Sequence, residues 1–114
     1  MSIFEPEIFP PEADYRARFK QMIDSEFYNL ELDEVARRSV SELAERGAKE
    51  LSQSIFRERA TGRRRELYVE RAEANLGTIL RRIREQMREK NEKKLTVETF
   101  NTVMRGICPL WPFC

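Results

Sequence analysis

The chain has 114 residues, of which 36% are charged, and its 21 Lys and Arg side chains nearly balance 20 Asp and Glu side chains, for a net charge of +1. This length suffices for one domain with a modest hydrophobic core that needs no metal or disulfide. A hydrophobic share of 40% argues against disorder, and only four glycines in a charge-rich chain favour helices over a turn-rich β fold.

The first predicted element is an extended arm over residues 1–12. Its three prolines disfavour a helix, and its apolar side chains lead us to expect that the arm lies in a hydrophobic crease. A first helix follows from about residue 11 to residue 29, because apolar residues recur there at steps of three and four. This stripe consists of Tyr15, Phe19, Met22, Ile23, Phe27 and Leu30.

A second helix is predicted from about Asp33 to Arg59. The Asp33 side chain can accept a hydrogen bond from a free amide of the first turn, and Glu34 adds negative charge where a helix favours it. Gly47 lies within the apolar face, where its missing side chain lets a neighbouring helix approach closely at a propensity cost of about 1 kcal/mol. The face consists of Val35, Ala36, Val40, Leu43, Ala44, Gly47, Leu51 and Ile55.

The third and longest helix is predicted from about Arg63 to Asn91, after a turn at Ala60-Thr61-Gly62. Val69, Leu76 and Ile83 lie seven residues apart on it and form a seam close to heptad spacing. The seam can pack against the first two helices or against the same seam of a second chain. A homodimer is therefore one of the two arrangements that the seam predicts.

A short fourth helix is predicted between Thr96, which can cap it, and Gly106, which ends it. The pattern as a whole indicates an all-α fold: a small four-helix domain with a long central helix, an extended proline-containing N-terminal arm and an apolar C-terminal tail over residues 108–114. We see no internal repeat or linker, so residues 1–114 are expected to be one domain. With no signal sequence and no apolar run of about 18 residues, we expect a cytoplasmic protein without a membrane span.

The tail is the strongest candidate for a functional segment. It contains the only tryptophan and both cysteines, and no charged side chain. We predict that Leu110, Trp111 and Phe113 anchor a partner, because aromatic residues dominate interface cores and prolines limit the entropy lost on docking. The alternative is that the tail folds back and caps its own core.

The two cysteines, Cys108 and Cys114, are the candidates for a redox or disulfide role. A bridge between them would close only a small ring and constrain little else. A closed zinc site needs four ligands, and the chain offers no histidine and no further cysteine, so only a site shared across a dimer could supply them. We therefore expect two reduced thiols, no metal site and no cofactor.

Enzyme functions are disfavoured by the same lack of histidine, which removes the commonest general base and the usual partner of a nucleophile. The acidic residues lie at ordinary helical spacings, and no glycine-rich phosphate loop is present. The sequence therefore predicts a protein that is not an enzyme.

A basic stripe on the third helix is the remaining candidate site. Arg64, Arg71 and Arg82 share one flank at steps of seven and eleven, which indicates anion binding and makes a nucleic-acid-associated module the second hypothesis. Interleaved glutamates, and a single aromatic residue (Tyr68) for base stacking, make it the weaker one. The first hypothesis is a helical protein–protein interaction, regulatory or adaptor protein that uses the tail as its anchor, on a partner protein or on a second copy of itself.

Overall fold

The computed structural model describes residues 10–107 and 110–113. They form an elongated domain of 56 × 23 × 18 Å. Its elements are, in chain order, α1 (Pro10–Phe27), β1 (Glu31–Leu32), α2 (Glu34–Glu58), α3 (Gly62–Glu89), β2 (Lys94–Leu95) and α4 (Val97–Arg105). The predicted all-α fold with four helices and a long third helix is confirmed.

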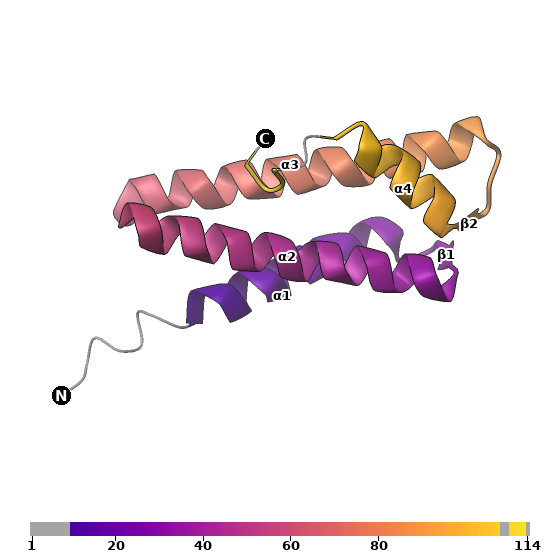
Figure 1. Cartoon of the computed structure of the whole chain (residues 1–114). Coiled ribbons are helices and arrows are strands. Elements are labelled where there is room, and N and C mark those ends of the chain that lie inside the picture. The colour runs from indigo at the N-terminus through magenta and orange to yellow at the C-terminus, as the bar shows by residue number, and fades with distance from the viewer. Residues whose placement is uncertain (1–9, 108–109, 114) are drawn as a thin grey trace.

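The two longest helices, α2 and α3, form an antiparallel hairpin (Figure 1). The helix α1 packs along α2 and also touches α3, and α4 lies against both α3 and α2 near the end remote from their connection. After α4 the chain turns back toward the middle of the hairpin, where residues 110–113 lie. No helix in the described part of the chain is long and apolar enough to cross a membrane.

The starts of α2 and α4 are capped by the side chains that the sequence indicates. Asp33 Oδ1 accepts a hydrogen bond of 2.9 Å from the Ala36 amide, and Thr96 Oγ1 accepts one of 3.3 Å from the Thr99 amide. Both capping residues have extended backbone angles, as N-cap residues do. Thr61 stands at the equivalent place before α3, but its side chain makes no capping bond.

Asp33→Ala is expected to lower the free energy of unfolding by about 1 kcal/mol, because the Ala36 amide loses its partner. Thr61→Ala is the matched control: it changes an N-cap whose side chain makes no such bond, and we expect a much smaller loss. Urea denaturation followed by circular dichroism measures both. Equal losses in the two variants would contradict this assignment of the caps.

One of the predicted boundaries is wrong. The arm predicted over residues 1–12 extends too far, because α1 already begins at Pro10. Proline is tolerated in the first turn of a helix, where the amide that it lacks would have no partner within the helix. Residues 1–9 lie outside the described part of the chain. The second helix ends at Arg59 as predicted, where a left-handed φ of 54° caps α2, and Gly62, with φ 56°, is the first residue of α3 rather than the last residue of the turn.

A short parallel pairing of β1 with β2 joins two segments that are far apart in sequence and lie at the same end of the fold. Glu31 pairs with Lys94 and Leu32 with Leu95, and Asp33 donates its amide hydrogen to the Leu95 carbonyl oxygen at 3.1 Å. The Leu95 side chain is fully buried. The pairing therefore fixes the loop before α2 against the loop before α4.

The heptad seam of α3 packs inside the chain. Leu76 and Ile83 are fully buried, and Val69 is partly buried against the core. The seam is therefore occupied by the other elements of the same chain rather than left for a second copy. The surrounding core is formed by Phe19, Ile23, Phe27, Val40, Leu43, Leu51, Ile79, Leu80, Met87, Leu95, Phe100 and Trp111.

Candidate partner-binding surface

The tail is held on the hairpin chiefly by Trp111, which is only 1% exposed. Its indole Nε1 donates a hydrogen bond of 3.0 Å to the Leu43 carbonyl oxygen of α2. Its ring lies 5.6 Å, centroid to centroid, from the ring of Phe19 on α1. Trp111 therefore belongs to the core of its own domain, as in the alternative prediction that the tail caps its own core.

The seat of the indole is made by Gly47. A Cβ atom added to this glycine would lie 2.6 Å from Trp111 Cε2 and 2.7 Å from Nε1, closer than real Cβ atoms approach their neighbours. The apolar face of α2 is approached closely at Gly47, as predicted, but the neighbour is the tail and not a helix. The missing side chain is the space into which the tryptophan fits.

The rest of the tail contacts α3. Asn75 Nδ2 donates a hydrogen bond to the Pro112 carbonyl oxygen, and the ring of Phe113 meets Tyr68 edge to face with centroids 5.9 Å apart. The Phe113 amide donates to the Leu110 carbonyl oxygen at 2.8 Å, which closes the tail into a turn. The tail thus bridges α2 and α3.

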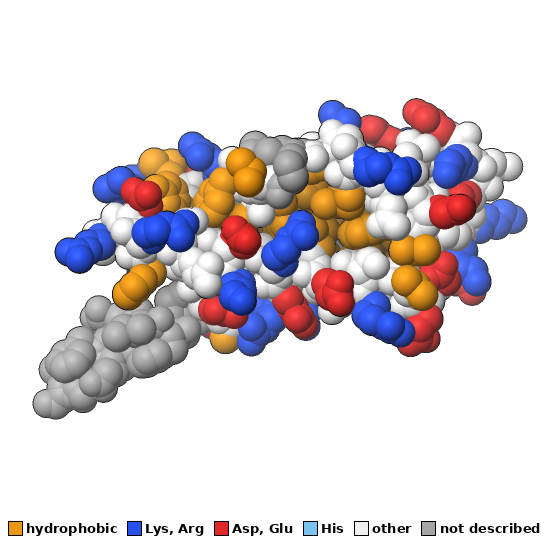
Figure 2. Space-filling view, in the orientation of Figure 1, with side chains coloured by type: hydrophobic (Ala, Val, Ile, Leu, Met, Phe, Trp, Pro, Cys, Tyr) orange, Lys and Arg blue, Asp and Glu red, His pale blue; other side chains and the backbone are white. Residues whose placement is uncertain are grey.

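Only part of the predicted anchor is accessible at the surface. Leu110 is 71% exposed and Phe113 is partly buried, whereas Trp111 is enclosed. Figure 2 shows apolar side chains around the tail and between α2 and α4 on this face, with Lys and Arg side chains at the margins. Cys108 and Cys114, the predicted redox or disulfide pair, lie outside the described residues.

Two of the three predicted arginines flank the place where the tail meets α3. Arg64 lies four residues before Tyr68, and Arg71 lies three after it, so both are neighbours of Tyr68 on the helix surface. Arg82 shares the flank but lies seven residues beyond Asn75, two turns from the tail contacts. All three are exposed. Helical spacing therefore places Arg64 and Arg71 beside Tyr68, which the tail contacts, and leaves Arg82 two turns away.

The ion pairs of this flank differ from one arginine to the next. Arg64 lies 3.7 Å from Glu58 at the end of α2. Arg71 and Arg82 form no ion pair with any residue in the described ranges. Arg71 is thus the basic side chain beside the tail whose charge is available to an acidic group.

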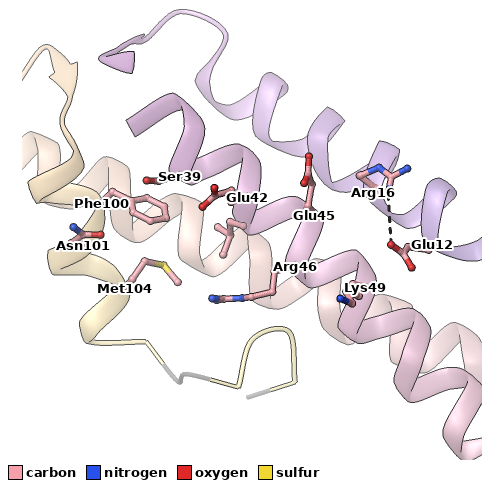
Figure 3. Close-up of a pocket in the computed structure, with 11 residues that line it drawn as sticks. Glu12, Arg16, Ser39, Glu42, Glu45, Arg46, Lys49, Phe100, Asn101 and Met104 are labelled. Atoms are coloured by element: carbon pink, nitrogen blue, oxygen red, sulfur yellow. Dashed lines mark ion pairs between the residues drawn. The ribbon is translucent and has the colours of Figure 1, made fainter. Parts of the chain in front are cut away.

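An open groove of about 820 Å³, which the sequence did not indicate, runs beside the seat of the tryptophan. Phe100, Asn101 and Met104 of α4 line it opposite Ser39, Glu42, Leu43 and Arg46 of α2 (Figure 3). Further along, Glu45, Lys49 and the ion pair between Glu12 and Arg16 complete its lining. Three acidic and three basic side chains share this lining, so it selects neither an anion nor a cation.

The titratable side chains of the described residues form no metal-binding cluster. No group of three or more His, Cys, Asp or Glu side chains among them could hold a metal ion. Burial raises the pKa of the Tyr15 phenol, and the positive charge of Arg65 opposes this rise. Tyr15 is part of the core face of α1, and its burial there accounts for the raised pKa. Comparison with protein-family models, with curated proteins and with solved structures finds no match.

Proposed function

We propose that this chain is a non-enzymatic interaction domain that binds a partner protein through the surface around its tail. This tail surface consists of Leu110, Phe113, Tyr68, Arg64 and Arg71. One observation supports this proposal most. Trp111 holds the tail on the domain, and the tail then presents an exposed Leu110 and the Phe113–Tyr68 ring pair, with Arg64 and Arg71 nearby on α3. The tail then serves as an anchor whose tryptophan fixes its shape and whose leucine faces the partner.

The chemistry of the tail surface indicates the kind of partner. Apolar and aromatic side chains at the centre with arginine at the rim are typical of protein interfaces. An apolar segment with acidic neighbours fits such a surface, since Arg71 can pair with a carboxylate in two parallel hydrogen bonds. Because the tail is already folded onto the domain, little conformational entropy is lost when the partner docks.

Leu110→Asp is expected to reduce partner capture by the full-length chain strongly. The experiment compares proteins retained by immobilised wild-type and variant chains from nuclease-treated extract, using quantitative mass spectrometry. We expect specific partners to fall about tenfold with Leu110→Asp, as for a residue at the centre of an interface, and to fall also with Arg71→Glu at its rim. Light scattering on the same proteins identifies a partner that is a second copy of the chain.

Tyr28→Asp is the matched control, because Tyr28 is an exposed aromatic residue, 83% accessible, after the end of α1 and outside the tail surface. It is expected to retain the same proteins as the wild type. Identical losses in Leu110→Asp and Tyr28→Asp would overturn the proposal. Arg82→Glu tests the nucleic-acid hypothesis: it lies off the tail surface, so weakened oligonucleotide binding with unchanged partner capture would separate the two functions.

A further inference from the structure

A second exposed apolar side chain, Phe56, lies on a different face of α2 from the one that carries the tail. It is 74% exposed. Glu45, Lys49, Ser52 and Phe56 follow one another at steps of four, three and four, so they share one face of the helix. Glu45 forms an ion pair of 3.5 Å with Lys20 of α1. Phe56 therefore lies on the side of α2 that α1 covers further along.

Phe56 lies at about the level where α1 begins. The two helices run antiparallel, and Pro10 precedes Lys20 by ten residues while Phe56 follows Glu45 by eleven. At 1.5 Å per residue these separations are about 15 and 17 Å, so α1 starts within about one turn of the level of Phe56. The first described residue of the chain thus lies at about the level of an exposed aromatic ring.

The connection from α2 to α3, next to Phe56, is strongly basic. Residues 57–66 contain five arginines and two glutamates. Arg63 and Arg64 form ion pairs there. Arg57, Arg59 and Arg65 form none with the residues that the structure describes, and all three are exposed.

The arm before Pro10 has the complementary composition. It carries aromatic, aliphatic and acidic side chains and no Lys or Arg. These are Ile3, Phe4, Ile8 and Phe9, with Glu5 and Glu7 between them. Nine extended residues span up to about 30 Å, so the arm is long enough to pass Phe56 and reach the arginines.

We propose that residues 3–9 dock in cis on the end of the α2–α3 hairpin, with their aromatic rings against Phe56 and their two glutamates facing Arg57, Arg59 and Arg65. Attachment within a turn of the docking surface gives the arm an effective concentration in the millimolar range, which favours it over a second chain. Covering Phe56 removes its apolar surface from water. This inference is independent of the proposed function, which concerns the tail surface.

Photo-crosslinking of the full chain tests the docked arm. With Phe4 replaced by benzoylphenylalanine, irradiation is expected to give a crosslink within the monomer, mapped by mass spectrometry to residues 54–67. Phe56→Ser is expected to remove it. Glu5→Lys together with Glu7→Lys is expected to lower its yield about fivefold, the equivalent of two exposed ion pairs. All these positions are exposed or precede the first helix, so we expect the variants to fold like the wild type. Their circular dichroism spectra check this.

The position of the crosslink distinguishes the docked arm from its alternatives. The same photo-crosslinker at Tyr28, 83% exposed and beyond the other end of α1, is the control and is expected to leave residues 54–67 unmodified. Crosslinks between two chains would show that the arm docks on a second copy of the chain and not in cis. Crosslinks elsewhere in the monomer, or a yield that Phe56→Ser leaves unchanged, would overturn the proposal.

Discussion

Trp111→Ala is expected to lower the free energy of unfolding by about 3–5 kcal/mol, the usual cost of removing a large buried aromatic side chain. Trp111 is 1% exposed, contacts the Phe19 ring and donates to the Leu43 carbonyl oxygen. The cavity that alanine leaves adjoins the open groove between α2 and α4, at the edge lined by Leu43. Since a domain of this size is typically stable by only about 5–15 kcal/mol, the variant loses a large part of its stability.

Urea denaturation followed by circular dichroism measures this loss, since the variant has no tryptophan fluorescence. Leu110→Ala is the control in the same tail: its side chain is 71% exposed, so we expect a change within about 0.5 kcal/mol. A Trp111→Ala variant as stable as the wild type would show that the tail does not cap the core in solution. The tail would then be free to act as an anchor through all three of its large side chains.

The helices of this fold were predictable because their signals are local. Periodic apolar residues and the caps at Asp33 and Thr96 act over a few neighbours, and the structure shows both. The predicted arm reached past the start of α1, because prolines that break the interior of a helix fit its first turn. The pairing of β1 with β2 was missed because two residues from each loop carry no alternating pattern.

The seat of the tail was not predictable in the same way, because it depends on residues distant in sequence. The hydrogen bond from Trp111 to Leu43 joins positions 68 apart, and no periodicity indicates such a contact. A glycine on the apolar face of α2 was a signal that something approaches closely there, but not what. Likewise helical spacing placed Arg64 and Arg71 on one flank, while their position beside the tail follows from where the tail docks.

Gly47→Ala is expected to destabilise the wild-type chain and to stabilise a chain that already carries Trp111→Ala. In the wild-type chain the new Cβ would overlap the indole, which Phe19 and the Leu43 carbonyl hold in place, so we expect a loss of about 1–3 kcal/mol from overpacking. In a Trp111→Ala chain the obstacle is gone. Alanine is then favoured over glycine within a helix by about 1 kcal/mol, and the same substitution stabilises.

The four chains of this double-mutant cycle are compared by their free energies of unfolding in urea, and the difference between the two effects measures the contact itself. Gly77→Ala in α3 is the control for helix propensity: an added Cβ there would meet only Arg81 Nη1, at an ordinary 3.7 Å, so we expect it to stabilise both backgrounds equally. An equal effect of Gly47→Ala in both backgrounds would mean that Gly47 is not the seat of the tryptophan. The opposite signs expected here arise only if the indole occupies the space that glycine leaves open.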